Sequence, residues 1–404
     1  MRRVLSIVFL VATQAAAQGP VGAPFQINES ISGSVSFPDV ASQPDGSFVV
    51  VWSSDQDGDG AAVRARRFSR NGSALSGEFG VNEETLGDQF RPRVATDGRG
   101  DFVVVWSGQD GDGTGVSARL FAADGTALGP EFQVNAETAG SQQHPAVSRS
   151  ASGAILVSWF DHTSDSVAAA TFDAAGSPML AEFVVSTTGL YPGTSDLACG
   201  IRSDGDFVVA WVAAHEVGGS PTTDIFQKRY SAGGVPLSGD FQLSDPGPNG
   251  WYFSYNPDLG VDEHDNFLVV WHTQLNLAWG QVRGRRTDAS GMTGPIRELS
   301  DASEGHEFSM APGGEFVVQW FDYFAYGIES SRFDALGNEV DSFPVPEPYG
   351  LGAQSHLSRD STEFVTAHRP GGPEPGLIGQ RFGSRLFADG FESGDTAEWS
   401  ETVP

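Results

Sequence analysis

The sequence predicts an all-β protein, a single seven-bladed β-propeller with four antiparallel strands per blade and a ring closed by the N-terminal strand. Three observations support this prediction. A short apolar run recurs at a regular interval, three further strand-like segments flank each run, and a spare strand at the start of the chain matches one that is missing at the end.

The recurring run is an apolar segment that ends in an aromatic residue in six of its copies. Residues 48–52 and 102–106 are the clearest copies, and six of the nine tryptophans of the chain end a run. Such short runs, rich in β-branched and aromatic residues, predict strands that are buried on both faces. The seven copies begin at residues 48, 102, 155, 207, 267, 316 and 364. A period of about 50 residues is typical of propeller blades.

Each run is flanked by segments that complete a four-stranded unit. A segment with an early proline precedes it, as in residues 37–41 and 91–95, and proline fits only the start or the edge of a strand. An alternating segment such as 62–68 follows the run, and a glycine-containing turn then leads to a fourth segment such as 131–135. We expect the tryptophans that end the runs to pack between neighbouring blades rather than to bind a ligand.

The two ends of the chain are complementary in strand content, since the last copy ends after its third strand, near Phe382. The chain begins with an orphan fourth strand at residues 24–28, which matches residues 131–135. We therefore expect residues 24–28 to pair as the outermost strand of the blade that holds residues 364–382. This pairing leaves no open strand edge in the ring.

The first 17 residues have the pattern of a secretory signal peptide. Arg2 and Arg3 precede an apolar run, and small residues end at Ala17, where we expect cleavage. The apolar run is far shorter than the roughly 20 residues of a membrane-spanning helix, so we expect export to the periplasm or the extracellular space and no membrane span. The expected organisation is a signal peptide at 1–17, a propeller at 18–383 and a C-terminal tail at 384–404.

The composition limits the partners of the protein. The chain carries 23 basic and 52 acidic residues, a formal net charge of −29. Nucleic acid is excluded as a partner, because phosphate binding requires clustered Lys and Arg. The single cysteine, Cys199, cannot form an internal disulfide, and we expect it to be a small core residue. We expect the protein to be a monomer.

The repeats resemble tandem units of large secreted bacterial proteins, many of them described as hemolysin-type or calcium-binding. The shared features are the run at 48–52, the Ala-Arg-Arg-Phe of 65–68 and the Glu-Phe-x-Val-Asn of 131–135, and the resemblance covers residues 24–382. It implies a secreted propeller-like module with no shared catalytic activity. The tail at 387–400 resembles a short ending of exported proteins of Gram-negative bacteria, which supports export alone.

Aromatic residues in one long loop are the first candidate binding site. Variable loops on a rigid scaffold commonly bind ligands, and the connection 244–255 is the richest of them in insertions. Aromatic rings with polar groups suit an extracellular glycan or a peptide segment of a protein. The alternative is that the rings fold onto their own blade. The candidate residues are Trp251, Tyr252, Phe253 and Tyr255.

Acidic loops after the first two runs are the second candidate site. Carboxylates at alternate positions followed by glycine resemble the start of a calcium loop, so calcium is the one cofactor that the sequence suggests. The pattern is incomplete, because the twelfth position counted from Asp55 is Arg66 rather than Glu. A solvated Asp–Gly turn is the alternative. The candidate ligands are Asp55, Asp57, Asp59, Asp110 and Asp112.

No catalytic residue can be assigned from the sequence. The repeats contain no nucleophile elbow, zinc-binding helix or phosphate-binding glycine loop. We expect His162, His215 and His272, which follow three successive runs, to lie too far apart to share one metal ion.

The sequence therefore predicts a secreted propeller that acts as a binding or interaction module. Two alternatives stay open: a glycan-acting hydrolase or lyase on the same scaffold, and a structural calcium-binding module. Carboxylates and arginines that converge at the axis of the disc would favour catalysis. An exposed aromatic rim would favour binding.

Overall fold

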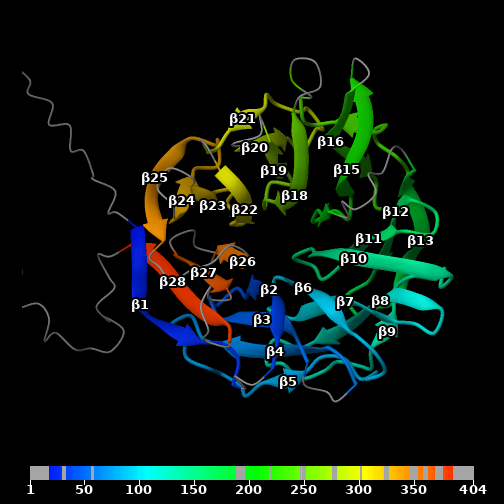
Figure 1. Ribbon diagram of the computed structural model, residues 1–404, viewed down its shortest axis with the longest axis vertical. Coiled ribbons are helices and arrows are strands. Elements are labelled where there is room, and N and C mark those ends of the chain that lie inside the picture. Colours follow the sequence, from blue (N-terminus) through cyan, green and yellow to red (C-terminus); the bar gives the residue numbers. More distant parts are fainter. Residues whose placement is uncertain are drawn as a thin grey trace, which may run out of the picture.

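The computed structural model is an all-β propeller, and Figure 1 shows groups of strands that follow one another around a common centre. Strands β26, β2, β6, β10, β18 and β22 lie nearest that centre. No helix in the described ranges is long and apolar enough to cross a membrane. The structure describes residues 18–29, 33–55, 59–187, 196–217, 220–245, 247, 252–274, 280–300, 303–322, 327–345, 354–357, 363–368 and 376–384.

The strands fall into consecutive four-stranded units, numbered here in chain order. Unit 1 contains β2 (Val35–Ser42), β3 (Phe48–Ser54), β4 (Ala62–Phe68) and β5 (Phe79–Gly80). Unit 2 contains β6 (Phe90–Thr96), β7 (Phe102–Gln109), β8 (Gly113–Phe121) and β9 (Phe132–Gln133). Unit 3 contains β10 (Gly140–Arg149), β11 (Ile155–Asp161), β12 (Ser166–Phe172) and β13 (Pro178–Ser186).

The second half of the chain repeats this order. Unit 4 contains β14 (Leu197–Ile201), β15 (Phe207–Val217), β16 (Ser220–Tyr230) and β17 (Phe241–Gln242). Unit 5 contains β18 (Phe253–Val261), β19 (Phe267–Gln274), β20 (Gly280–Thr287) and β21 (Arg297–Glu298). Unit 6 contains β22 (Ser303–Met310), β23 (Phe316–Asp322), β24 (Gly327–Phe333) and β25 (Glu339–Val345). The closing unit contains β26 (Gln354–Leu357), β27 (Glu363–His368), β28 (Ile378–Ser384) and β1 (Gln18–Gln26).

Hydrogen bonding joins these units into five sheets rather than the seven separate sheets that the sequence predicts. Three sheets have four strands, and two have eight strands, because units 2 and 3 pair with each other and so do units 5 and 6. A short parallel pairing of Gly140 with Gly113 links units 2 and 3. Glycine permits this contact, since a Cβ atom on Gly113 would lie 1.8 Å from the Gly140 carbonyl oxygen. A single pair, Gly280 with Ser303, links units 5 and 6.

The N-terminal strand closes the ring as predicted. β1 pairs antiparallel with β28 and is the outermost strand of the closing unit. Asn28, just after β1, accepts a hydrogen bond from the Leu377 N–H at 2.6 Å. In unit 1, Asn82 accepts the equivalent bond from the Val63 N–H at 2.8 Å. Residues from opposite ends of the chain thus reproduce a contact that belongs to an ordinary unit.

Arginines on the third strand of a unit attach it to the preceding unit. Arg66 Nη1 donates to the Ile27 carbonyl at 2.9 Å, and its Nε donates to the Ser76 carbonyl at 3.1 Å. Arg119 Nη1 makes the equivalent bond to the Val81 carbonyl, also at 2.9 Å. Carbonyl groups that lie outside the strand ladders are satisfied in this way. The first arginine of 65–68, Arg66, is therefore a structural residue.

The tryptophans that end the runs lie between units, which confirms the packing prediction. Trp52 belongs to one core cluster with Ile27 and Val365 of the closing unit, and Trp106 belongs to one with Val49 of unit 1. Removal of such a side chain typically costs about 3–5 kcal/mol of stability. The exposed fractions are 0% for Trp52, Trp159 and Trp271, 1% for Trp106 and Trp211, and 9% for Trp320.

Deletion of residues 18–28 should lower the melting temperature by many degrees, because β28 loses its partner and the ring gains an open edge.

The single change Asn28→Ala should also destabilise the protein, by about 1–3 kcal/mol, since it leaves the buried Leu377 N–H without an acceptor. Asn71→Ala, in an exposed turn, is the control for both. Calorimetric melting curves that coincide for wild type and deletion would contradict ring closure.

Candidate functional site: a cavity at the axis

The innermost strands bulge at one common position. The strand register shifts between residues 36 and 39, 90 and 93, 143 and 146, 255 and 258, and 304 and 307. A non-glycine residue in the left-handed region costs about 1–2 kcal/mol, and bulges often turn side chains toward a functional site. The first bulged residues have positive φ: Phe37 (50°), Arg91 (53°), His144 (56°), Asn256 (52°) and Gly305 (63°).

Two buried serines stabilise the bulges of the next unit. Ser53 Oγ accepts the Arg91 N–H at 3.1 Å, and Ser107 Oγ accepts the His144 N–H at 3.3 Å. Both serines directly follow a buried tryptophan, so the core strand of one unit holds the axial backbone of its neighbour. The direction of the Arg91 and His144 side chains therefore depends on contacts between units.

The bulged residues line a cavity of about 490 Å³ at the axis. Two sets of side chains contribute to it, which we call the first and second rings. The first ring, at or next to the bulged position, consists of Phe37, Arg91, His144, Asp196 and Asn256. The second ring, two residues further along the inner strands, contains the charged residues Asp39, Arg93, Asp258 and Glu307.

Arg93 has a central place among these charges. Its positive charge lowers the pKa of Asp39, Asp196, Asp258, Glu307, His144 and Arg91, residues that come from six different units. The Arg93 side chain is exposed to the cavity, and no hydrogen bond or ion pair joins it to any residue that the structure describes. Its guanidinium donors are therefore available to a ligand.

The carboxyl groups of the second ring have raised pKa values. Burial and, to a smaller extent, the nearby Asp39 raise the pKa of Asp258 to about 6, against the opposing effects of the Leu259 N–H and the positive charge of Arg93. Burial, followed by repulsion from Asp258, raises the pKa of Glu307 well above its usual value. Burial also raises the pKa of Asp39. Each carboxyl is half-buried, because one side faces the cavity while protein surrounds the rest.

Arg91 is held on two sides in the first ring. Its Nη1 lies 2.7 Å from His144 Nδ1, and its guanidinium lies 4.8 Å from the centre of the Phe37 ring. Burial and the charges of Arg91, His162 and Arg93 lower the pKa of His144 to about 3. His144 is therefore neutral near pH 7. Its Nδ1 accepts a hydrogen bond from Arg91 Nη1–H, and its Nε2 carries the ring hydrogen.

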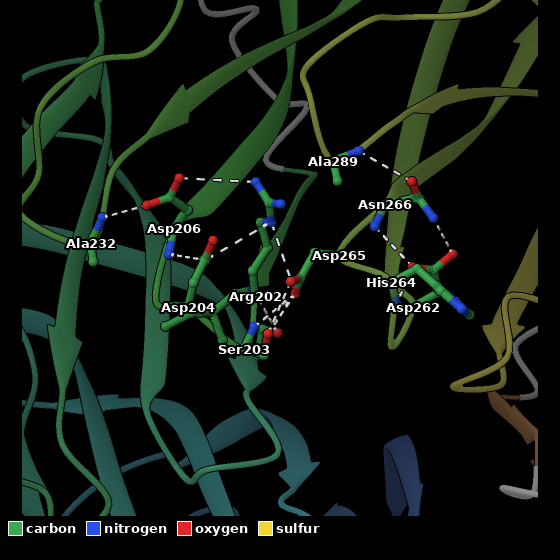
Figure 2. Close-up of polar contacts among 12 residues, drawn as sticks. Arg202, Ser203, Asp204, Asp206, Ala232, Asp262, His264, Asp265, Asn266 and Ala289 are labelled. Atoms are coloured by element: carbon green, nitrogen blue, oxygen red, sulfur yellow. Dashed lines mark hydrogen bonds and ion pairs between the residues drawn. The ribbon is translucent and has the colours of Figure 1, made fainter.

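The opposite end of the inner strands holds charges that are already paired. Figure 2 shows Arg202 between Asp204, Asp206 and Asp265, each with a carboxylate oxygen 3.9 Å from a guanidinium nitrogen. The Ser203 N–H donates to Asp265 at 3.0 Å, which ties unit 4 to unit 5. The acidic residues of these two turns therefore have a structural role, because they link unit 4 to unit 5.

The predicted aromatic rim is divided among different surroundings. Trp251 lies outside the described residues. Phe253 is 38% exposed, whereas the Tyr252 ring lies 5.3 Å from the Arg283 guanidinium. The Tyr255 hydroxyl donates to Gln274 Oε1 at 3.1 Å, and its ring packs against the cluster that contains Trp271. Of the three described rings, that of Phe253 is exposed. Ligand binding at this rim stays a prediction.

The predicted calcium loops are partly described. Asp57 lies outside the described residues, while Asp55, Asp59 and Asp112 are exposed. Asp110 accepts bonds from the Asp112 N–H and from Gln133, both at 3.3 Å. Within the described ranges, no group of three or more His, Cys, Asp or Glu side chains is placed to hold a metal ion. Calcium binding remains a prediction that depends on Asp57.

Sequence reasoning missed the two rings, although their residues were visible. The sequence predicts short strands at 37–41 and 91–95, and its patterns give no role to Asp39, Arg91 and Arg93, the charged residues next to Pro38 and Pro92. The bulge, which the proline alone does not reveal, turns Asp39, Arg91 and Arg93 toward the axis. Of the three histidines that follow successive runs, His162 has its ring centre 6.1 Å from that of His144. His272 is fully buried, and the side chain of His215 is not described.

Comparison with known proteins identifies a fold and no family. No protein-family profile matches the chain, and no curated protein matches its sequence. A lectin from Burkholderia pseudomallei has a similar structure, with a TM-score of 0.59 and 14% identity over 87% of this chain and 97% of the lectin. An ulvan lyase bound to a glucuronate–sulfated rhamnose unit has a TM-score of 0.55 and 11% identity, over 90% of this chain and 94% of the lyase.

A protein of unknown function from Dyadobacter fermentans is also similar, with a TM-score of 0.53 and 11% identity over 91% of this chain and all of that protein. At such identities the similarity shows the propeller fold alone. A glycan-binding protein and a glycan-cleaving enzyme share this fold, so the function must be argued from the cavity itself.

The acidic second ring should make the protein less stable as pH rises. A carboxyl group with a raised folded-state pKa favours folding at low pH, and that contribution is lost as pH rises through the raised value. Asp258→Asn should therefore raise the free energy of unfolding at about pH 8 by up to about 3 kcal/mol, and with it the melting temperature. At about pH 4 the change should have little effect.

Asp165→Asn, in an exposed loop, is the matched control and should leave the pH dependence of melting unchanged. An Asp258→Asn variant that is destabilised at high pH would show that the Asp258 carboxylate is well stabilised by its surroundings, contrary to this account.

Proposed function

We propose that this chain is an exported, seven-bladed propeller that binds a glycan in its axial cavity. The seven-blade count rests on the four-stranded units, because each eight-stranded sheet contains two of them. Export rests on the signal-peptide pattern of residues 1–17, and the proposed organisation keeps the propeller at 18–383 and the tail at 384–404. The binding role rests chiefly on Arg93.

Arg93 supports ligand binding because its donors have no described protein partner. A guanidinium carries five N–H donors in a fixed plane, and those of the exposed Arg93 side chain are accessible to water and to a ligand. Arg93 projects into a cavity of about 490 Å³, which lies within the usual range for small-molecule sites. A ligand rich in oxygen acceptors would complete its hydrogen bonding.

The remaining groups of the cavity suit a sugar. Hydroxyl groups both donate and accept, so they can bond to Arg93 and to the carboxyl groups of Asp39, Asp258 and Glu307. Phe37 is 46% exposed at the first ring and offers an apolar surface for the face of a sugar ring. The lectin with the same fold adds a precedent for a glycan ligand on a propeller.

Arg93→Ala should abolish glycan binding while the fold is retained, because it removes the free donors without disturbing a described contact. Arg99→Ala is the matched control, since Arg99 lies in the turn after the same strand with a side chain that is 65% exposed. A glycan array, followed by calorimetry with the best ligand, measures the difference. Equal binding by both variants would remove the axial cavity as the site.

Catalysis is the second candidate function, and the raised pKa of Glu307 is the observation that favours it. A carboxyl group with a raised pKa keeps its proton to higher pH than usual and can donate it to a leaving oxygen, with Asp258 or Asp39 as its basic counterpart. Glycan cleavage by paired carboxyl groups follows this pattern.

Glu307→Gln tests this second function, because glutamine keeps the shape and loses the proton. Glycan turnover should fall by about 100-fold or more with binding retained. Hydrolysis is measured through new reducing ends, and elimination through the ultraviolet absorbance of an unsaturated sugar. Glu216→Gln, on an exposed part of β15, is the control. A wild-type protein that binds the glycan without cleaving it would leave binding as the function.

A further inference from the structure

We infer that the ligand of the axial cavity is an acidic sugar, whose carboxylate or sulfate group is bound by Arg93 together with Arg91. This inference rests on the proposed glycan-binding function and goes beyond it by naming the chemical class of the ligand. A carboxylate and a sulfate group each present two oxygens that match the two parallel N–H donors of a guanidinium group.

Arg93 has no counter-ion among the described residues, unlike the arginines that form ion pairs elsewhere in the units. Arg149 Nη2 lies 3.1 Å from Asp97, Arg286 contacts Asp262, and Arg202 has carboxylates at 3.9 Å. No described carboxylate lies within 4 Å of a guanidinium nitrogen of Arg93, although four carboxyl groups face the same cavity. An anionic group of a ligand can therefore act as the counter-ion of Arg93.

Arg91 supplies a second, positioned guanidinium. The bulge and Pro92 fix its backbone, Ser53 holds its N–H, and His144 and Phe37 contact its side chain on two sides. Because Arg91 is already oriented, little side-chain entropy is lost when it binds a ligand. His144 engages Nη1 alone among the Arg91 guanidinium nitrogens, so other donors of the group remain for an anion.

The charge balance of the cavity changes with pH in the direction that favours an anion. The described titratable groups that face it are Asp39 on β2, Arg91 and Arg93 on β6, His144 and Arg149 on β10 with His162 beside His144, Asp196 before β14, Cys199 on β14, Asp258 on β18, and His306 and Glu307 on β22. Acid protonates the carboxyl groups with raised pKa, of which Asp258 has a value of about 6, while Arg91 and Arg93 stay charged. A bound anion therefore meets less repulsion as pH falls.

Binding of an acidic sugar should accordingly strengthen as pH falls and take up protons. Linkage requires this sign, because an anion near a carboxyl group raises the pKa of that group further. A neutral sugar should show a much weaker dependence on pH, since it gains little from the loss of negative charge. The dependence on pH thus separates the two ligand classes independently of affinity.

The experiment is calorimetric titration of the mature protein with three oligosaccharides of equal length, at about pH 5 and about pH 7.5 and at fixed ionic strength. The probes are a galacturonate trimer, a sulfated galactose trimer and a neutral galactose trimer. The better of the two acidic probes should bind at least about tenfold more tightly than the neutral one at the lower pH. Comparison of the two acidic probes tells whether the group is a carboxylate or a sulfate.

Variants link this preference to the residues. Arg93→Ala should lose the preference for acidic sugars, Arg93→Lys should retain part of it because the charge remains without the planar donors, and Arg99→Ala should behave as wild type. Melting curves establish that each variant is folded. Equal or tighter binding of the neutral trimer, with dependence on Arg93, would overturn the acidic-sugar inference and leave glycan binding intact. Failure of all three probes to bind would overturn both.

Discussion

The bulge in the innermost strands is the constraint on which the axial cavity depends. At this point Phe37, Arg91, His144 and Asn256 adopt a left-handed backbone conformation that ordinary residues disfavour. Contacts between units maintain it where they are described, since Ser53 and Ser107 accept the N–H groups of the bulges in the following units. Strain in the backbone is thereby offset by the packing of the whole ring, and the cavity can exist only while the ring is closed.

Ring closure was predictable from the sequence because it follows from counting strands. The orphan strand at residues 24–28 and the missing strand after Phe382 required no knowledge of side-chain direction, and the β1–β28 pairing confirms their match. The burial of Trp106 was equally predictable, since a fixed position in a buried run identifies a packing residue. The union of units into eight-stranded sheets was not predictable, because it depends on close backbone contacts such as that between Gly113 and Gly140.

The cavity residues were beyond sequence reasoning for a different physical reason. Arg91, Arg93 and Asp258 are far apart in the sequence or on different strands, and ring geometry alone brings them to one axis. Sequence patterns instead highlighted Tyr255, whose ring packs into the core, and Asp110, whose carboxylate is engaged within its own unit. The second ring also opposes folding at neutral pH, since burial raises the pKa of Asp258 and Glu307. Groups that cost stability in this way are frequent at functional sites.

A crystal structure of the mature protein with an acidic oligosaccharide tests the central claim most directly. The account predicts an ordered sugar at the axis, with its anionic group within hydrogen-bonding distance of the Arg93 guanidinium and a ring face near Phe37. An ordered sugar on the rim at Tyr252 and Phe253, with the axial cavity holding solvent alone, would contradict it.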